Sequence, residues 1–299
     1  MTVSRKGDRL TIESDRFRVR WDLDTGDPVS LQYDGNEVFA ANEEMPAQFS
    51  TQAFRAPVDN DRGFGNWLAA DWEKNGMSSP ATTTESVQWE KLPDNRIRVT
   101  TVKRNTYLKG SVVTRSGYTV SADGTIDVQL EFIPTGELPE LPRLGVVLML
   151  REDLEYYTWY GRGPHENYPD RKYSSPMGLW QSTVSEQFVN YPFPQENGNK
   201  EDIQALTLTD SNGQGIQVNA IDTPFSASAL HFLATDLAAA KHSHELEQRE
   251  ETILSIDAKQ LGLGNSSCGP GVLQRYAIDK KEHSLRFTIS PARAPLWSE

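Results

Sequence analysis

The chain has 299 residues, of which 37% are hydrophobic and 24% charged, and it contains seven Trp, ten Tyr and eleven Phe. This composition predicts a folded protein with a sizeable core and argues against disorder. The 42 acidic residues outnumber the 30 basic ones, giving a formal charge of -12 that disfavours binding to nucleic acid and to anionic membranes. A neutral ligand such as a sugar would be recognised through local contacts instead.

Short alternating segments separated by turn residues dominate the chain, which is typical of antiparallel strands. In chain order, two-stranded units are predicted at 16–33, at 87–103 around Pro93-Asp94-Asn95, at 117–132 around Asp123-Gly124, at 205–221 around Asn212-Gly213 and at 274–289 around Asp279 and Lys280. Two short helices are expected as excursions from the sheets, at 66–74 and at 236–246, the second with Asp236 as its cap.

The chain shows no low-complexity linker and no internal repeat, which argues against propeller and solenoid folds. The loop-rich segment 42–57 is a candidate boundary, and we take it as internal. We therefore expect one all-β domain over residues 1–299, built from two packed antiparallel sheets.

Cys268 is the only cysteine, so no disulfide forms within the chain, and a reducing compartment is its simplest location. No apolar run reaches the roughly 20 residues that a bilayer span needs, and the first residues lack the apolar region of a signal peptide. The sequence predicts a cytoplasmic protein without membrane contact. Export is left open if the chain is an excised domain.

Four segments interrupt the strand pattern with many Gly, Pro, Asn and charged residues, and such loops on a rigid β scaffold commonly carry function. They are FRAPVDNDRGFG at 54–65, WYGRGPHENYPDR at 159–171, YPFPQENG at 191–198 and LGLGNSSCGPGV at 261–272. In order and wording they resemble the final domain of the large multidomain β-galactosidases, which reads RAPxDND, YxGxGPxENYPDR, PxENG and then a glycine-rich loop. The resemblance covers about residues 10–291.

The resemblance implies the C-terminal domain or small subunit of a β-galactosidase, with an antiparallel β-supersandwich of the galactose mutarotase-like class. It also implies a partner, because the family's two catalytic glutamates lie in a TIM-barrel domain that this sequence lacks, and a retaining glycosidase needs both. The implied role is to complete the pocket in which the whole enzyme hydrolyses terminal β-galactosides, with no catalytic residue here. The family's Mg and Na ions belong to other domains, so no cofactor is expected. A surface that docks a barrel is also a candidate for homo-oligomer formation.

The four motifs supply the candidate substrate-binding residues. They are Arg55, Asp59, Asn60 and Asp61 in the first motif, Glu166, Asn167 and Arg171 in the second, Glu196 and Asn197 in the third, and Asn265, Ser266, Ser267 and Cys268 in the fourth. These side chains suit hydrogen bonds to sugar hydroxyls, and they suit equally a polar network that pins the loops. In that network Arg171 could pair with Asp59 or Asp61 across a cleft.

The fourth motif departs from the resembled pattern. In many members of that family this loop reaches the active site and offers an aromatic platform to the sugar. Cys268 stands where several relatives carry Trp, so stacking on a sugar face is lost at this position. Both alternatives stay open here: a wall of the galactoside pocket, or a turn that closes the sandwich without touching substrate.

A second class of function is a free-standing carbohydrate-binding or aldose 1-epimerase-like protein, since the implied superfamily contains sugar mutarotases. His165 with Glu166 or Glu196 would then supply the acid and the base. His242 and His244 have the spacing of a metal-binding pair on a strand, while on a helix they would diverge. Since the sequence suggests no third ligand nearby, no metal site is expected.

Overall fold

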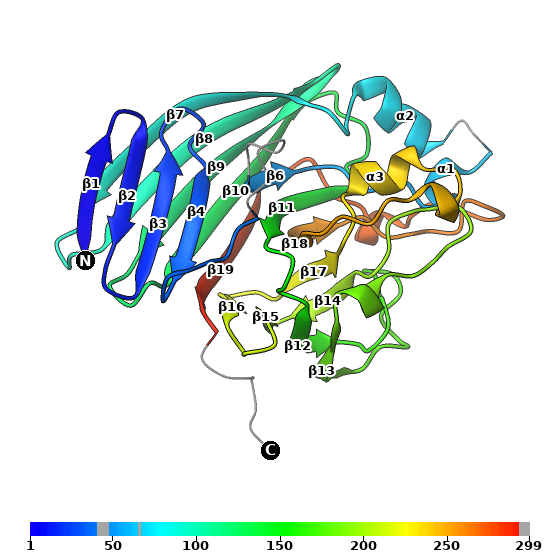
Figure 1. Cartoon of the computed structure of the whole chain (residues 1–299). Helices are drawn as coiled ribbons and strands as arrows, with labels where there is room; N and C mark the ends of the chain where they lie inside the picture. Colours follow the sequence, from blue (N-terminus) through cyan, green and yellow to red (C-terminus); the bar gives the residue numbers. More distant parts are fainter. Residues whose placement is uncertain (41–47, 65–66, 293–299) are drawn as a thin grey trace.

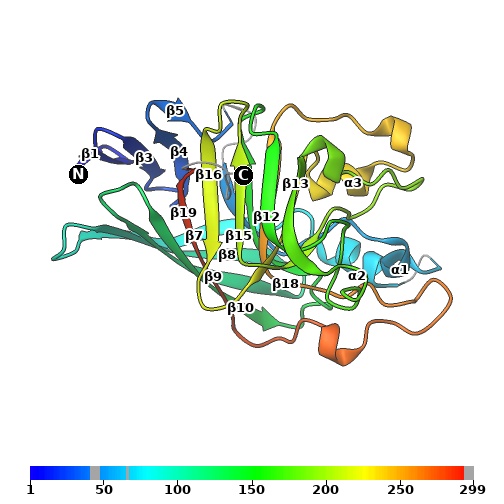
Figure 2. The same cartoon turned by 90° about the horizontal axis from the view of Figure 1, so that it is seen from below.

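The computed structural model describes residues 1–40, 48–64 and 67–292. Within these ranges the strands form three sheets, and the strand pairs are antiparallel throughout. Two five-stranded sheets lie next to each other, linked by an isolated bridge between Phe39 and Leu150, and they pack on a nine-stranded sheet (Figures 1 and 2). The expected all-β, antiparallel sandwich is confirmed.

The first five-stranded sheet follows chain order. Its strands are β1 (Thr2–Lys6), β2 (Arg9–Glu13), β3 (Phe17–Asp22), β4 (Pro28–Tyr33) and β5 (Asn36–Glu37). The alternation in β3 buries Phe17, Val19 and Trp21 and exposes the two arginines between them. The inward face packs on the nine-stranded sheet, where the Trp21 ring lies 5.8 Å from the ring of Tyr118. The opening hairpin predicted at 16–33 is therefore confirmed.

The nine-stranded sheet has the order β13-β12-β15-β16-β19-β10-β9-β8-β7. Its strands are β7 (Ala81–Lys91), β8 (Ile97–Tyr107), β9 (Gly110–Val120), β10 (Ile126–Gly136), β12 (Tyr156–Arg162), β13 (Met177–Thr183), β15 (Ala205–Thr209), β16 (Gly215–Ala220) and β19 (His283–Pro291). The hairpins predicted at 87–103, 117–132 and 205–221 are the pairs β7–β8, β9–β10 and β15–β16. Gly124 turns the second hairpin with a φ of 86°, a conformation that favours glycine.

The hairpin predicted at 274–289 is wrong in its first half. Gln274–Tyr276 forms a 3₁₀ helix, and the carbonyl of Tyr276 accepts a hydrogen bond from the backbone of Gly262. The second half is β19, but its partners are β10 and β16, strands from distant parts of the chain. The local alternation thus predicted the strand β19 correctly, but the segment expected to pair with it is not a strand.

The second five-stranded sheet has the order β14-β17-β18-β11-β6. Its strands are β6 (Phe49–Gln52), β11 (Arg143–Leu150), β14 (Lys200–Ile203), β17 (Phe225–Leu230) and β18 (Thr252–Gln260). One face of β18 sends Leu254 and Ile256 into the main hydrophobic core. Most residues on the other face of β18 are also buried, because α3 (Ala234–Ala239) and neighbouring loops lie over it (Figure 1).

Helices are few in the described part of the chain. Besides α3 they are α1 (Asp59–Arg62), α2 (Leu68–Asn75) and the 3₁₀ helices Ser185–Gln187, Ser243–Glu245 and Gln274–Tyr276. The helix predicted at 66–74 corresponds to α2, with residue 66 outside the described residues. Within the described ranges, every helix is too short or too polar to cross a bilayer.

The helix predicted at 236–246 is wrong in extent. α3 begins at Ala234 and ends at Ala239, and Ala240 is extended with a ψ of 136°. Asp236 lies in the first turn rather than at the cap, and its carboxylate reaches back to accept a hydrogen bond from the backbone of Leu233 at 2.8 Å. Asp236 therefore caps the start of the helix, but it does so from within the first turn rather than from the residue before the helix.

One hydrophobic core joins all three sheets, with buried side chains that run from Leu10 in β2 to Ile289 in β19. The segment 42–57, taken as an internal loop, lies partly outside the described residues, and its described part contains β6. The single domain over residues 1–299 stays a prediction.

Candidate functional site

The four sequence motifs meet at the end of the molecule that carries α1 and α2 (Figure 1). The first motif runs from the end of β6 into α1, and the second begins within β12 and continues into the loop after it. The third precedes β14, and the fourth follows β18. Hydrogen bonds join the first motif to the third and the fourth, and the second motif to the third and the fourth. The structure thus brings together loops that are far apart in the sequence.

Arg55 and Asp61 form a buried bidentate ion pair within the first motif. The two side chains are 0% and 1% exposed, and the N–O distances are 2.7 and 3.1 Å. The guanidinium also donates to the backbone carbonyls of Leu261 and Gly262 in the fourth motif. Because a buried charge needs such partners, this pair fixes the base of the glycine-rich loop.

Three further side chains hold the glycine-rich loop by its backbone. Asn60 donates to the carbonyl of Gly264 at 2.8 Å, and its amide oxygen accepts from both the backbone and the hydroxyl of Ser267. The carboxylate of Asp170 accepts from the backbone of Leu263 and of Gly264, at 2.9 and 2.8 Å. Arg171 adds a hydrogen bond to the carbonyl of Gly264 at 2.6 Å.

Two expectations for the charged residues change here. Arg171 does not pair with Asp59 or Asp61, because its guanidinium contacts Asp170, Gly264 and the side chain of Asn265. Asp59 is 65% exposed and lies 3.5 Å from Arg62, so it is a surface group rather than part of the buried network.

The tip of the glycine-rich loop is open to solvent. Asn265 and Cys268 are exposed, while Ser266 and Ser267 are half-buried. The carbonyl of Asn265 accepts hydrogen bonds from the backbone of Cys268 and Gly269, which closes a tight turn. Gly264 has a φ of 64°, and a side chain there would meet the backbone of Val272 at 2.8 Å, so only glycine fits.

Glu166 joins the second motif to the third. Its carboxylate accepts from the backbone of Gly198 at 2.9 Å and from the hydroxyls of Tyr168 and Tyr191. Burial, together with this carboxylate, raises the pKa of Tyr191. Lys200, which the sequence analysis did not single out, is buried nearby, and burial lowers its pKa to about 8.

The side chains of Asn167 and Asn197 are completely buried and form hydrogen bonds with backbone groups of neighbouring loops and strands. The side chain of Asn167 accepts from the backbone of Glu201 at 2.9 Å, and that of Asn197 accepts from the backbone of Val189 at 3.0 Å. Their side-chain amides are used within the loops. Both therefore fit the pinning role that the sequence left open as the alternative to sugar binding.

Glu196 belongs to a second buried charge cluster, with Arg143 and Asp257. Arg143 lies 2.7 Å from the carboxylate of Glu196 and 3.0 Å from that of Asp257, and all three side chains are at most 4% exposed. Burial raises the pKa of Asp257 to about 7 even though the neighbouring Arg143 opposes the shift. Neither Arg143 nor Asp257 was found from sequence, although a charged residue inside an otherwise apolar strand is a usable signal.

The histidines of the alternative functions are placed as follows. His165 is exposed, and within the described residues no hydrogen bond or ion pair joins its side chain to Glu166 or Glu196. His242 and His244 lie at the start of a 3₁₀ helix with their rings stacked 5.4 Å apart. Glu245 lies beside them as a third group within ligand distance, which the sequence analysis did not identify. The absence of a metal site stays a prediction.

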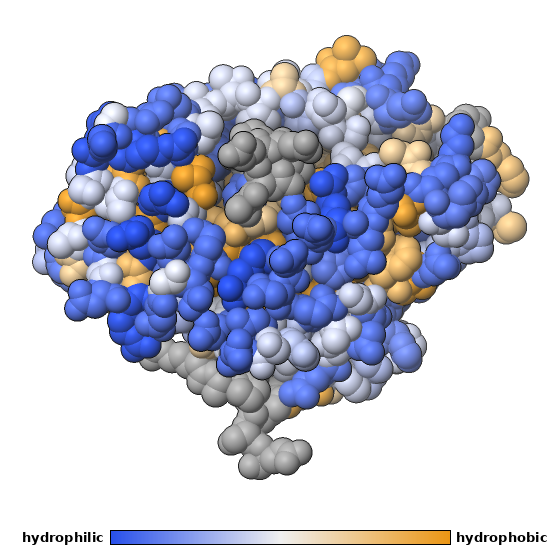
Figure 3. All heavy atoms as spheres, in the orientation of Figure 1, coloured by the Kyte–Doolittle hydropathy of each residue, from blue (hydrophilic) through white to orange (hydrophobic). Residues whose placement is uncertain are grey.

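Exposed apolar residues surround the loop cluster. Phe64 is 90% exposed, Leu273 54%, Trp67 45% and Phe193 38%. The Trp67 ring lies beside Gly271 of the glycine-rich loop, and Arg62 stacks on Phe193 with its guanidinium carbon 3.6 Å from the ring centre. Figure 3 shows apolar surface along the end of the molecule that carries α1 and α2.

Among solved structures, the chain is similar to a putative aldose 1-epimerase from Escherichia coli K12, with a TM-score of 0.48 and 10% identity over 97% of this chain and 98% of that one. It is also similar to an aldose epimerase homologue from C. elegans, with a TM-score of 0.49 and 9% identity over 98% and 100% of the two chains. Likeness at this level bears on neither activity nor ligand.

Similarity in sequence is greater. The chain is 29% identical to a β-galactosidase of Priestia megaterium, 30% to one of Halalkalibacterium halodurans and 31% to one of Lactobacillus delbrueckii subsp. bulgaricus. These alignments cover 94 to 97% of this chain but only 27% of each relative, so the chain spans about a quarter of their length. A family model described as the β-galactosidase small chain matches residues 13–289. The chain therefore belongs to the β-galactosidase small chain family.

Proposed function

We propose that this chain is the C-terminal domain or small subunit of a β-galactosidase, and that it completes the galactoside pocket of a catalytic TIM barrel carried elsewhere. One observation carries the proposal: the glycine-rich loop is fixed by its backbone while its tip stays open. Arg55, Asn60 and Asp170 hold residues 261–264, and Asn265 and Cys268 at the tip are exposed. A loop held in this way presents its tip to a partner with little loss of entropy on binding.

The carboxylates of the motifs support the view that the chain does not hydrolyse glycosides alone. Glu196 is paired with Arg143, Asp61 with Arg55, and Glu166 accepts hydrogen bonds from a backbone amide and two tyrosines. A retaining glycosidase needs two carboxyl groups about 5 to 5.5 Å apart, facing the scissile bond. Carboxylates used in structural pairs do not fit that task.

The apolar rim around the loop supports docking at this end of the molecule. Protein interfaces favour aromatic and Arg anchors, and Trp67, Phe193 and the stacked Arg62 are of that type. In this proposal the rim packs against the barrel and the loop tip faces the galactoside. The Mg and Na ions of the whole enzyme stay in its other domains, and the cytoplasm is its location.

The test is reconstitution. The purified chain should give no turnover of a chromogenic β-galactoside, and activity should appear when the polypeptide that carries the barrel is added. Size-exclusion chromatography of the mixture should show a complex at the same stoichiometry at which activity saturates. Turnover by the chain alone, or full activity of the barrel polypeptide without it, would refute the proposal.

A further inference from the structure

A row of small hydroxyl side chains crosses the outer face of the second five-stranded sheet. Ser228 in β17 pairs with Ser255 in β18, Ser255 pairs with Val147 in β11, and Val147 pairs with Ser50 in β6. Directly paired residues on neighbouring strands point to the same face. This face therefore carries three serines where a covered sheet usually carries large apolar residues.

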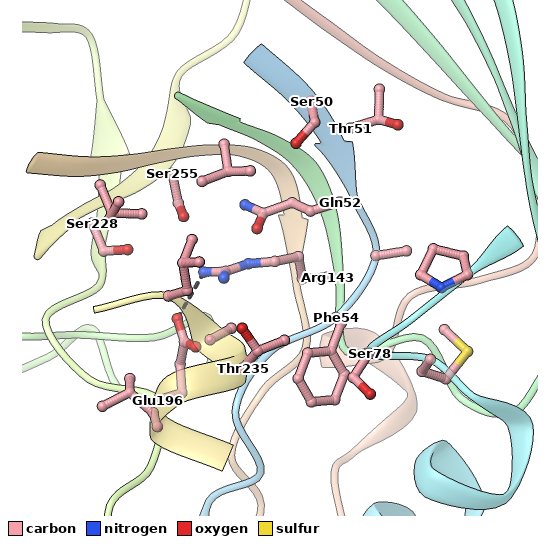
Figure 4. Close-up of a pocket in the computed structure, with 18 of the residues that line it drawn as sticks. Ser50, Thr51, Gln52, Phe54, Ser78, Arg143, Glu196, Ser228, Thr235 and Ser255 are labelled. Atoms are coloured by element: carbon pink, nitrogen blue, oxygen red, sulfur yellow. Dashed lines mark hydrogen bonds and ion pairs between the residues drawn. The ribbon is translucent and has the colours of Figure 1, made fainter. Parts of the chain in front are cut away.

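The small side chains leave a cavity of about 250 Å³ between the sheet and its cover (Figure 4). The cover consists of α3, Phe54 and Met77, and no residue of the glycine-rich loop lines the cavity. Ser228 and Ser255 lie in its buried part, whereas Thr235 on α3 and Ser78 after α2 are exposed. The mouth thus lies between the start of α3 and the segment that follows α2.

The buried hydroxyls lack partners. Ser228 is 4% and Ser255 6% exposed, and neither side chain makes a hydrogen bond to any residue within the described ranges. Gln52 donates to Val146 and Asp257, which leaves its amide oxygen free to accept. Because these hydroxyls open onto the cavity, they can form hydrogen bonds with a polar occupant there.

The charges lining the cavity favour a neutral occupant. Arg143 and Glu196 meet at its inner end and pair with each other, as the dashed line in Figure 4 shows. Phe54 and Phe232 add apolar surface to the lining, and Leu230 lies on the same sheet face as Ser228, two residues along β17. Hydroxyls, an amide and apolar side chains lining one cavity suit the hydroxyls and the C–H face of a sugar ring. The volume is below the roughly 300 to 1,000 Å³ of sites for drug-sized ligands.

We propose that this cavity binds a neutral, polyhydroxylated ligand of monosaccharide size. The ligand hydroxyls hydrogen-bond Ser228, Ser255 and Gln52, and its C–H face lies on the apolar side chains. This site goes beyond the proposed function, because it is complete in this chain and needs no barrel.

The test is ligand-observed NMR titration of the chain alone with D-galactose, D-glucose, myo-inositol and glycerol. At least one of the cyclic probes should bind in the millimolar range, and glycerol should bind more weakly. Ser228→Ala and Ser255→Ala should each weaken binding about two- to tenfold, the effect of one hydrogen bond. Thr235→Trp should abolish binding by blocking the mouth from an exposed position.

The matched control is Ser226→Ala, on the same strand and 6% exposed but outside the cavity lining, which should leave binding unchanged. Thermal melts report whether each variant is folded, and the serine-to-alanine changes add no volume. Absence of binding by all four probes, or binding that survives both Thr235→Trp and the double alanine variant, would overturn the site. So would a crystal soaked in the probes that shows only ordered water. Since the barrel is absent throughout, failure here leaves the reconstitution test untouched.

Discussion

Arg55 and Asp61 show how single residues of the first motif act through burial rather than exposure. Both side chains are inaccessible to solvent, and the guanidinium also donates hydrogen bonds to two backbone carbonyls of the glycine-rich loop. A buried guanidinium that loses its carboxylate partner remains a buried charge. The stability of this end of the molecule therefore depends on the pair as a unit.

Replacing Asp61 tests that dependence. Asp61→Asn should lower the free energy of unfolding by about 3 to 5 kcal/mol, because it leaves the Arg55 charge buried without a counterion. The measurement is urea denaturation followed by tryptophan fluorescence. Asp59→Asn is the control on the same helix, and because Asp59 is 65% exposed its effect should stay within about 0.5 kcal/mol. Equal effects of the two changes would contradict the buried-pair account.

Asp257 predicts a pH dependence of stability. Its pKa in the folded chain is raised to about 7, whereas an aspartate in the unfolded chain titrates at about 4. Between these values the unfolded chain has released the proton and the folded chain still holds it. The stabilisation that protonated Asp257 gives to the folded chain is therefore fully present below about pH 4 and is lost as the pH rises through 7.

Asp257→Asn should remove this part of the dependence. The free energy of unfolding of the variant, minus that of the unchanged chain, should rise between pH 4 and pH 7 and level off above. The absolute offset also reflects the loss of a partner for Arg143, so only the slope tests the assignment. Asp222→Asn, at an exposed site, should give a flat difference. A difference that stays flat over the same window would show that Asp257 ionises at its ordinary pH.

The sequence identified the chemically rich residues but not their partners. The motif wording singled out Arg171, yet its contact is Gly264, 93 positions away, rather than Asp59 or Asp61. Which groups meet depends on how distant loops fold against one another, and that is set by the sheets. Arg143 and Asp257 each stand out as a charged residue in a mostly apolar strand, but the sequence does not show that β11 and β18 pair and bring the two residues together.

Among elements, the glycine-rich loop is the one whose shape depends on side chains from elsewhere. The backbone amides of Leu263 and Gly264 both donate to Asp170, which lies on a different loop. Asp170→Ala should therefore release these two amides and make their hydrogen exchange faster by about tenfold or more. In the reconstituted enzyme, the KM for the galactoside should rise more than kcat falls if the loop positions the sugar as proposed.

The control for that loop is Asp94→Ala. Asp94 is an exposed carboxylate that also accepts a backbone hydrogen bond, but it lies in the turn between β7 and β8. It should change neither exchange at 263 and 264 nor the KM. If Asp170→Ala leaves the KM unchanged while exchange accelerates, the loop is mobile in the variant but does not touch the substrate.

The sequence predicted strand pairing correctly where a local turn determines the partner, and it failed where contacts between distant parts of the chain determine it. Hairpins with an Asp-Gly or Asn-Gly turn are specified within about 15 residues, and the pairs β9–β10 and β15–β16 formed as expected. β19 has no such local partner, because it fills the gap between β10 and β16 in the large sheet. The helix predicted at 236–246 ends at Ala239. Past its end, the backbone of Lys241 donates to the carboxylate of Glu245, so this segment takes its hydrogen bonds from a side chain.

At the scale of the whole molecule, the formal charge of -12 means that docking to another acidic polypeptide works against repulsion. In the proposed function, attachment at the end with α1 and α2 draws on apolar contact, for which Phe64, Trp67, Phe193 and Leu273 are exposed candidates. Salt screens the repulsion between like charges but not apolar contact. If the barrel polypeptide also carries net negative charge, its association with this chain should therefore strengthen as ionic strength rises.

The double variant Trp67→Ser with Leu273→Ser tests this surface. It should weaken association by about tenfold or more, the usual effect of removing central aromatic anchors, and should leave thermal stability of the chain nearly unchanged because both side chains are half-exposed. Tyr156→Ser is the control: its ring is 50% exposed but lies at the start of β12, away from the loop cluster. Affinity measured by calorimetry that falls for Tyr156→Ser and not for the double variant would move the docking surface to the β12–β13 edge, and the glycine-rich loop would then face solvent rather than a galactoside.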